Sequence, residues 1–583
     1  MIAPAPVRRI EIVAVLSLAT DLAIGQPVEF ALRSCALAVA LASAARLDSE
    51  LVRQVYYQAL LRYIGCNADT EAQVALLGDE MLMRHEFALV DQGSPRDVLF
   101  VIIRALRRAN ADRALPAAVF AIVQGFLSSR AASARILTGH CEVAQRLAAR
   151  LGFDAAVIAN LGQLYERWDG KGMPQGLRGD AIAIPVRVVT LAQDLIVLEE
   201  SLGRHDALAT IRERRGRAYD PALVDTLLAC ADSLLARSAQ VVAWDAALAL
   251  EPRPHHVLTD AELDDACVVI ADFIDIRWPA RLGHSRAVAA LAEGAARKLG
   301  SPAQDITDAW RAGLVHDLGE SAIPVSTWDK SGPLSDRERD AIRLHPHHTE
   351  RVLVRTSAAQ LRRVATAAGQ HHERINGSGY HRGLRGPEQQ VIARVLAAAE
   401  VYQTKREYRP HRAALSADAA AALLKQLVRD GALDGDAVGA VLSVAGHRVP
   451  PVRRESTAGL TPREIEVLRL IAFGRSAKQI AQALGMSVRT ADNHTRHIYE
   501  KSGVTTRAAA ALFAIEHGLL GADAAAPQPH LIPAAAISRF TSCPQFSTTI
   551  GSYRCAPASR LSMMKCRPSR DTSKLRHDTV PFV

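Results

Sequence analysis

Apolar side chains recur at intervals of three and four residues along most of this chain. The segment SRAVAALAEGAARKLG at 285–300 shows the pattern, with alanine, valine and leucine separated by charged residues. This spacing matches the 3.6-residue turn of an α-helix and not the two-residue alternation of a strand. Alanine, leucine and arginine, which favour helices, are abundant, whereas aromatic residues make up only 5%. We therefore predict an all-α fold.

Breaks in the helical pattern divide the chain into regions. Its 583 residues are too many for one hydrophobic core. Proline-rich or polar stretches fall at 250–260 (LEPRPHHVLTD), at 447–457 (HRVPPVRREST) and after Leu520. The last residues mix serine, proline, threonine and arginine without periodicity, which is typical of disordered chain. We predict helical domains over 1–249 and 263–450, a small helical domain over 459–521 and a disordered tail over 522–583.

An internal repeat relates the two long helical regions. YERWDGKGMPQGLRGDAIAIPVRV at 165–188 aligns without gaps with HERINGSGYHRGLRGPEQQVIARV at 372–395. Upstream, FALRSCALAVALA (30–42) and RYIG (62–65) have the same spacing as HSRAVAALAEGAA (284–296) and HDLG (316–319). Duplication of a helical domain of about 200 residues is the simplest explanation.

The two copies differ at positions that could carry chemistry. The second copy has His284, His316, Asp317, His371 and His372 where the first has Phe30, Arg62, Tyr63, Leu164 and Tyr165. Imidazole and carboxylate groups together suit iron, manganese or zinc, and the five replacements are poor ligands. His140, near the position of His345 or His347, is more typical of packing or of the surface. We therefore predict a metal site in the second copy only.

The predicted site has more ligands than one ion needs. The expected set is His284, His316, Asp317, His345, His371, His372 and Glu400. An aspartate beside a histidine can bridge two ions, and two ions about 3.5–4 Å apart generate a hydroxide and clamp a phosphodiester. The glycine-rich loop after His372 would let the backbone approach a bulky phosphate ester. The pattern thus predicts a dinuclear site with a substrate seat beside it.

The motifs HDLGE, HPHHTERVL and HHERINGSGYHRGLRG, in this order, resemble those of the HD-GYP family, a helical branch of the HD superfamily. The resemblance covers about 265–448 and, more faintly, 10–240. Members of that family hydrolyse cyclic di-GMP or related cyclic dinucleotides with two or three metal ions, often iron or manganese. By position, the resemblance implies one metal ion bound by His284, His316, Asp317 and Glu400. It implies a second metal ion bound by His345, His371 and His372, with Asp317 bridging the two ions. The resemblance also implies catalytic roles for Asp317 and His316. It implies that the edge of the substrate-binding site, here called the substrate lip, is formed by Gly377, Gly379, Tyr380 and Arg382.

The chain departs from the family pattern near the expected scissile phosphate. The family has lysine where this chain has Glu320, which removes a cation that would stabilise a dianionic transition state. We therefore expect lysine at 320 to raise any activity. This chain has Ala280 and Gln403 at two positions where family members can have an acid that binds a third ion. We therefore expect a dinuclear iron or manganese site. Further departures are Asn376, His381 and Glu400.

Residues 460–520 predict four short helices. Thr461, Pro462 and Glu464 form an N-cap, a first-turn proline and a capping-box acid. Gly485 ends the second helix, and Ser487 caps a third helix with a polar outer face. A helix, a tight turn and a polar helix form the helix-turn-helix arrangement, whose second helix enters the major groove. An ordinary small helical bundle is the alternative.

The same stretch resembles the LuxR-type helix-turn-helix over its whole length, with LTPRE at the start and GV near the end. The resemblance implies that double-stranded DNA bases contact Asp492, Asn493 and Arg496. It implies phosphate contacts for Lys478, Ser487, Arg489, Thr490 and Lys501. Such domains usually bind as dimers, so we expect a homodimer. The whole architecture is then two HD-superfamily helical domains in tandem, a four-helix LuxR-type domain and a disordered tail.

The charge distribution places nucleic-acid contact at the C-terminal end. The net charge is +9, and residues 459–521 hold eight basic against five acidic residues. Residues 522–583 hold eight against three, so the first 458 residues are close to neutral. A basic patch is the electrostatic footprint of nucleic-acid binding.

Cysteine usage and hydropathy bear on localisation. The eight cysteines include no C-x-x-C pair, so we expect no disulfide framework and a reducing cytoplasm. The apolar stretch IEIVAVLSLATDLAIG at 10–25 carries Glu11 and Asp21, which argues against a signal sequence. No apolar run approaches the ~20 residues that a membrane span needs.

Three functions fit these patterns. The chain could be a transcription regulator whose helical domains sense a ligand or metal. It could be a cyclic di-GMP phosphodiesterase that a DNA-binding domain localises or regulates, and these two functions are compatible. The third is a catalytically inactive scaffold that only binds DNA. Metal-dependent hydrolysis that requires Asp317 would distinguish the enzyme from the scaffold.

Overall fold

The computed structural model describes residues 6–68, 70, 86–87, 89–109, 134–239, 243–330, 332–410, 412–446, 460–517 and 519–520. Over these residues the chain forms helices and a few isolated bridges but no strand, so the predicted all-α class is confirmed. All of them belong to one compact unit. The linker predicted at 447–457 and the tail predicted at 522–583 lie outside the described residues.

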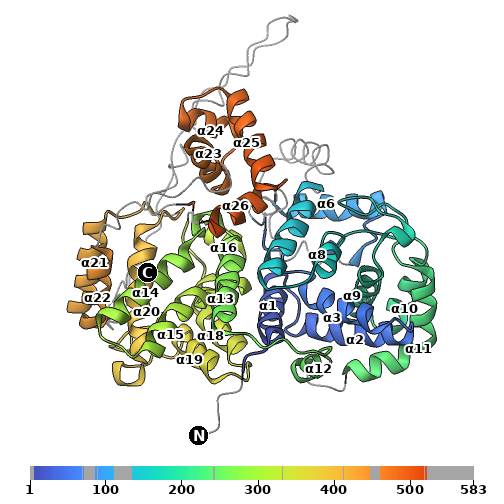
Figure 1. The fold of residues 1–583 in the computed structure, drawn as a ribbon, viewed down its shortest axis with the longest axis horizontal. Coiled ribbons are helices and arrows are strands. Elements are labelled where there is room, and N and C mark those ends of the chain that lie inside the picture. The colour runs from blue at the N-terminus through green and yellow to red at the C-terminus, as the bar shows by residue number, and fades with distance from the viewer. Residues whose placement is uncertain are drawn as a thin grey trace, which may run out of the picture. The chain divides into compact units, whose positions relative to one another are not determined.

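The first copy is a bundle of α-helices, drawn from blue to green in Figure 1. Residues 134–150 are also helical. Its named elements are α1 (Arg9–Ala23), α2 (Phe30–Ala44), α3 (Ser49–Leu61), α6 (Pro95–Ala109), α8 (Ala155–Leu161), η1 (Gly179–Ala181), α9 (Ile184–Leu202), α10 (Arg204–Glu213), α11 (Pro221–Ala239) and α12 (Ala243–Ala249).

The second copy is drawn from green to orange (Figure 1). Its helices are α13 (Asp260–Asp275), η2 (Pro279–Arg281), α14 (His284–Lys298), α15 (Ala303–Val315), η3 (Leu318–Ala322), α16 (Val325–Trp328), α17 (Asp336–Arg343), α18 (His345–Leu353), α19 (Ala359–Gly369), η4 (Gly386–Glu388), α20 (Val391–Arg406), α21 (Ala417–Arg429) and α22 (Gly435–Ala445).

The repeat in the sequence is also a repeat in the fold. Helices α2 and α14 start at equivalent residues, each after a left-handed residue, Glu29 with φ 78° and Gly283 with φ 81°. Helix α2 packs against α3 and α9, as α14 packs against α15 and α20. Asp21 accepts a hydrogen bond from the backbone N–H of Ala31, and Asp275 accepts one from the backbone N–H of Ser285.

The glycine-rich loops of the two copies are held in the same way. Glu166 accepts a hydrogen bond from the Leu177 N–H at 2.9 Å, and Glu373 accepts one from the Leu384 N–H at 2.9 Å. In the second loop a Cβ atom on Gly379 would lie 2.4 Å from the nitrogen of Arg374, and Gly172 makes the same close approach in the first. Only glycine leaves room for this backbone packing.

The segment that resembles a signal sequence is a core helix. Helix α1 buries almost every side chain, including the carboxylates of Glu11 and Asp21. Its apolar residues belong to one buried cluster that also contains the cores of both copies. Within the described part of the chain, no helix combines the length and the apolar character required to cross a membrane.

The C-terminal module has the four predicted helices, α23 (Pro462–Ala472), α24 (Ala477–Leu484), α25 (Val488–Ser502) and α26 (Arg507–Glu516). The predicted capping box forms, with the Thr461 hydroxyl accepting from the Glu464 N–H and the Glu464 carboxylate accepting from the Thr461 N–H. Gly485 ends α24 with φ 64°, and the Ser487 hydroxyl caps α25. The module has a core of its own around Leu468, Ile480 and Ile498.

We expect the capping-box acid to make the stability of this module depend on pH. Burial alone would raise the pKa of Glu464, but the ammonium of Lys501 at 2.7 Å and the Thr461 N–H lower it from 4.5 to about 2. The ionised carboxylate therefore stabilises the fold above pH 4.5, and this stabilisation disappears as the pH falls towards 2. Glu464→Gln should lower the free energy of unfolding by about 1–2 kcal/mol at pH 7.

Denaturant unfolding of the module between pH 7 and pH 3 measures this difference. It should shrink steadily below pH 4.5, because the protonated wild-type side chain then resembles glutamine. A difference that stays constant over this range would mean that the charge of Glu464 contributes nothing.

Candidate metal centre and DNA-binding face

Helix ends bring the seven predicted ligands of the second copy together. His284 opens α14, His316 and Asp317 follow α15, His345 opens α18, the pair at 371–372 follows α19, and Glu400 lies within α20. All seven are buried, with at most 7% of any residue exposed. Burying so many ionisable groups is costly unless they are paired or coordinate a metal.

Asp317 lies at the centre of this cluster. Its Oδ2 atom is 3.1 Å from Nε2 of His316 and 3.6 Å from Nε2 of His284. Its Oδ1 atom is 3.4 Å from Nε2 of His345 and 3.5 Å from Nε2 of His371. The two oxygens of one carboxylate thus face two different sets of ligands, which is the arrangement of a bridging group.

The first set is His284, His316 and Glu400. A carboxylate oxygen of Glu400 lies 3.0 Å from Nε2 of His284 and 3.2 Å from Nε2 of His316. The second set is His345, His371 and His372, whose ligand atoms all lie within 4.8 Å of one another. Three or four nitrogen and oxygen donors per set suit one transition-metal ion each.

Hydrogen bonds fix the orientation of four imidazoles. Nδ1 of His316, His345 and His371 lies 2.8, 2.6 and 2.6 Å from the carbonyl oxygens of Gly313, Ile342 and Ala368. A carbonyl can only accept, so each Nδ1 carries the proton and each Nε2 presents a lone pair to the cluster. Nδ1 of His284 similarly faces the Glu407 carboxylate at 2.9 Å. Partners of this kind orient metal-binding histidines.

The lone pairs of two histidines face one another. Nε2 of His345 lies 3.0 Å from Nε2 of His371, and neither atom carries a proton because Nδ1 donates in both rings. Two facing lone pairs repel unless a cation lies between them. Nδ1 of His372 is buried without a hydrogen-bond partner. The donor set therefore fits a metal ion.

The surroundings keep the second set neutral. Burial lowers the pKa of His345 to about 4 and lowers those of His371 and His372 well below the usual value. Neutral imidazole is the form that binds metal. His284 differs, because Glu407 and Glu400 outweigh its burial and raise its pKa to about 9, so an ion in the first set must displace a proton.

The sequence did not reveal the roles that two carboxylates have at this site. Glu407 orients His284, and its position two helical turns beyond Glu400 was a usable signal. Glu320 was expected only as the loss of a cation. Its carboxylate instead pairs with Arg281 at 2.6 Å, and this arginine lowers the pKa of Glu320 against the effect of burial. A lysine at 320 would face Arg281, so the structure removes the reason to expect it to raise activity.

The predicted substrate-lip residues form the wall next to His372. The ring of Tyr380 stacks on that of His372 with centroids 4.7 Å apart, and the Arg343 guanidinium lies 5.5 Å from the centre of the Tyr380 ring. Arg382 is exposed and pairs with Glu350 at 2.5 Å. Gly377, with φ 81°, and Gly379 shape the loop backbone.

The first copy fills the equivalent space with its own side chains. Phe30 is fully buried, and its ring lies 6.2 Å from that of Tyr63. Arg62 is buried and donates to the Thr190 hydroxyl at 2.7 Å. An internal guanidinium and apolar rings thus take the place of the histidines and the aspartate.

His140 is a packing residue, as the sequence indicated. Gly65 approaches its carbonyl as Gly319 approaches that of His345, which makes His140 the counterpart of His345. Its Nδ1 lies 3.0 Å from the Tyr165 hydroxyl and its Nε2 lies 3.2 Å from the Ala68 carbonyl.

Of the predicted DNA-binding residues, Lys478 lies on α24 and the others lie on α25 or at its N-cap. All eight are exposed, namely Lys478, Ser487, Arg489, Thr490, Asp492, Asn493, Arg496 and Lys501. Some of them have bonds within the module: Lys501 holds Glu464, Ser487 caps α25 and bonds to the Thr490 hydroxyl, and Arg496 lies 3.8 Å from Glu500. Ile498 is buried, and His494 is partly buried.

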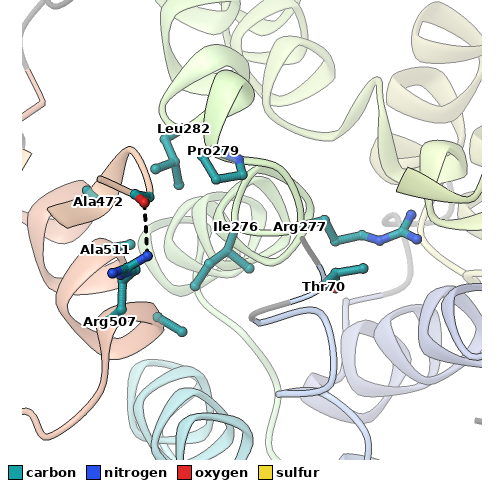
Figure 2. A pocket seen from close by; sticks show the side chains of 10 residues that line it. Thr70, Ile276, Arg277, Pro279, Leu282, Ala472, Arg507 and Ala511 are labelled. Atoms are coloured by element: carbon teal, nitrogen blue, oxygen red, sulfur yellow. Dashed lines mark hydrogen bonds between the residues drawn. The ribbon is translucent and has the colours of Figure 1, made fainter. Parts of the chain in front are cut away.

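A pocket lies apart from both sites. Figure 2 shows it between the segment Ile276–Leu282 and helix α26, where Arg507 donates to the Gly474 carbonyl at 2.9 Å. None of the predicted metal ligands or DNA-binding residues lines it.

Two family models match the chain. One describes the HD domain and matches residues 113–223 and 268–436, one stretch in each copy. The other describes bacterial regulatory proteins of the luxR family and matches residues 458–514.

Two curated relatives and one solved structure extend this comparison. The 3′3′-cGAMP-specific phosphodiesterase 3 of Vibrio cholerae is 26% identical over 422 residues, which cover 71% of this chain and 90% of that protein. A cyclic di-GMP phosphodiesterase of Pseudomonas aeruginosa is 36% identical over 129 residues, 22% of this chain and 31% of that protein. A crystal structure of the cyclic GMP-AMP-specific phosphodiesterase V-cGAP3 of V. cholerae superposes with a TM-score of 0.53 at 23% identity, covering 76% of this chain and 99% of that one. The superposition supports the helical fold.

Proposed function

The chain carries HD-domain sequence in both copies and a LuxR-type regulatory domain at 458–514, and from this premise we propose that it is a metal-dependent phosphodiesterase and a DNA-binding transcription regulator. Its substrate is a cyclic dinucleotide, for which cyclic di-GMP and 3′3′-cGAMP are the candidates. The metal centre is dinuclear, with iron or manganese as the ions.

One observation carries the enzymatic half of this proposal. Two deprotonated Nε2 atoms, of His345 and His371, lie 3.0 Å apart on one side of Asp317, while Glu400 and two further histidines lie on the other side. Both groups are buried. Such a set of donors is stable when cations neutralise it.

Each group of residues has a part in the reaction. Two bound ions would supply a hydroxide nucleophile and neutralise a phosphodiester. Asp317 holds the two ligand sets at a fixed separation, and the carbonyls and Glu407 behind the imidazoles keep their Nε2 atoms aimed inward. Tyr380, stacked on His372, offers a flat surface beside the ligands on which a base or ribose can lie.

Hydrolysis by the purified full chain tests this function. We expect cleavage of a cyclic dinucleotide after loading with Mn²⁺ or Fe²⁺ and none after the metal is removed by a chelator. Cyclic di-GMP and 3′3′-cGAMP should be assayed in parallel, because the two relatives are named for different substrates. Bound metal without cleavage of either dinucleotide would contradict the hydrolase.

A sensor without turnover is the second candidate. It is favoured by Glu320, which places an acid beside the cluster at a position where the HD-GYP pattern has lysine. In that case the metal-loaded chain would bind a cyclic dinucleotide tightly and leave it intact, and the dinucleotide would change the affinity for DNA.

The regulatory half of the proposal depends on the exposed face of α25. Its polar residues lie on one side of the helix while Ala491 and Ile498 pack inward, as a helix that enters the major groove requires. We propose that the chain acts in the cytoplasm as a homodimer on two-fold DNA sites. Sedimentation with and without such a DNA fragment tests the dimer.

A further inference from the structure

Arg281 is a buried cation within the candidate metal centre. It ends the 3₁₀-helix η2, three residues before His284, and only 8% of its side chain is exposed. Its Nη2 atom contacts Oδ2 of Asp317 and lies 2.6 Å from Oε1 of Glu320. One guanidinium thus pairs with two carboxylates of the site.

The rest of this guanidinium is available to bind a further group. A guanidinium has five N–H donors, and Nε of Arg281 is buried without a hydrogen-bond partner. Two neighbouring arginines are committed elsewhere: Arg277 donates to the carbonyls of Glu320 and Ile323, and Arg409 binds Glu407. Among the described arginines, Arg281 is the one that pairs with Asp317. A buried donor without an acceptor is costly unless a ligand supplies one.

A metal ion and Arg281 compete for Asp317. Oδ2 of Asp317, the atom that Arg281 contacts, also faces His316 and His284 of the first ligand set. A divalent ion on this oxygen would repel a guanidinium held a few ångströms away. Glu320 can keep Arg281 in place when Asp317 turns to the metal, because it binds the same Nη2 atom independently.

We propose, building on the function proposed above, that Arg281 is the substrate-binding cation of this site. In the metal-free protein it pairs with both Asp317 and Glu320. In the metal-loaded protein it stays on Glu320 and donates from Nε and Nη1 to a phosphate oxygen of the cyclic dinucleotide. Glu320 is then the positioning residue of Arg281, and it holds the remaining N–H donors of the guanidinium next to the phosphodiester.

Three variants of the full chain test this role: Arg281→Gln, Arg281→Lys and Glu320→Gln. The first measurement is calorimetric titration of metal-free protein with Mn²⁺, which needs no turnover. Arg281→Gln should bind the same two ions about 10-fold more tightly, because the competing cation is gone. Arg281→Lys should resemble the wild type, which excludes a defect in folding.

The second measurement is the affinity of Mn²⁺-loaded protein for the slowly hydrolysed phosphorothioate analogue of cyclic di-GMP. Arg281→Gln should weaken this binding by about 10- to 100-fold, the usual value of a hydrogen bond to a charged group. Glu320→Gln should keep two ions and weaken binding less, because Arg281 remains but loses its anchor.

The outcomes separate this role from the proposed function. Wild-type protein that binds no Mn²⁺ would overturn both. Wild-type protein that binds two ions and the analogue, with Arg281→Gln unchanged in both affinities, would overturn the role of Arg281 alone. Loss of one Mn²⁺ equivalent in Glu320→Gln would also overturn it, because Glu320 would then be a metal ligand together with Asp317 and His345, to which it lies close.

Discussion

Asp317→Asn is expected to lose both metal ions and all measurable phosphodiesterase activity. The two oxygens of Asp317 face separate ligand sets, at 3.1 Å from His316 and 3.4 Å from His345, so an amide would weaken both sites. Loss of a residue that merely orients a ligand costs 10- to 100-fold in metal affinity, and the loss of a bridging ligand should exceed about 100-fold. Metal analysis by mass spectrometry and hydrolysis of cyclic di-GMP measure the two effects.

Asp194→Asn in the first copy is the matched control. Asp194 is a partly buried carboxylate whose pKa is raised by desolvation, and it accepts a hydrogen bond from Tyr219 at 2.9 Å. Its variant should keep the wild-type metal content, because the first copy lacks the histidines. Equal metal loss in both variants would mean that unfolding, and not ligand removal, causes the effect. Normal metal content in Asp317→Asn would refute the bridging role.

Arg496→Ala is expected to weaken binding to the chain's DNA site by about 10- to 100-fold. The Arg496 side chain is 66% exposed on α25, and its nearest acid is Glu500 at 3.8 Å, so it is available to a base edge. A good bidentate contact with a base contributes about 1–3 kcal/mol. A site selected from a random DNA library with the wild-type chain provides the probe for a titration at fixed salt.

Lys425→Ala removes the same charge from α21 and serves as the control for this variant. Lys425 is exposed and lies outside the C-terminal module, so its variant should bind as the wild type does. The thermal unfolding of α23–α26 should be unchanged in Arg496→Ala because this side chain is mostly exposed and its ion-pair partner Glu500 is exposed too. Wild-type affinity in Arg496→Ala would show that another face of the module meets the bases.

The features that the sequence predicted correctly depend on local residue patterns or on the internal repeat. Helix spacing indicated the all-α class, and the caps at Thr461, Gly485 and Ser487 located α23 to α25, because such signals act within a few residues. The duplication pointed to the candidate metal ligands by contrast, since Phe30 and Arg62 in the first copy occupy the places of His284 and His316. That contrast needs no knowledge of tertiary structure.

The sequence did not reveal what depends on contacts between distant segments. Arg281 precedes α14 and meets Glu320 in η3, 39 positions later, and no periodicity relates the two. Glu320 therefore looked like a lost cation when it is half of an ion pair. The inward orientation of the histidines was equally hidden, because carbonyls of Gly313, Ile342 and Ala368 set it, and every residue has a carbonyl.

The location of metal ions in crystals of the full chain grown with Mn²⁺ tests the central claim most directly. Anomalous scattering at the manganese edge should show two peaks, one beside each oxygen of Asp317, about 3.5–4 Å apart. No peak should occur beside Arg62 and Tyr63 in the first copy. Manganese bound anywhere else, or absent from the space between His345 and His371, would contradict the account.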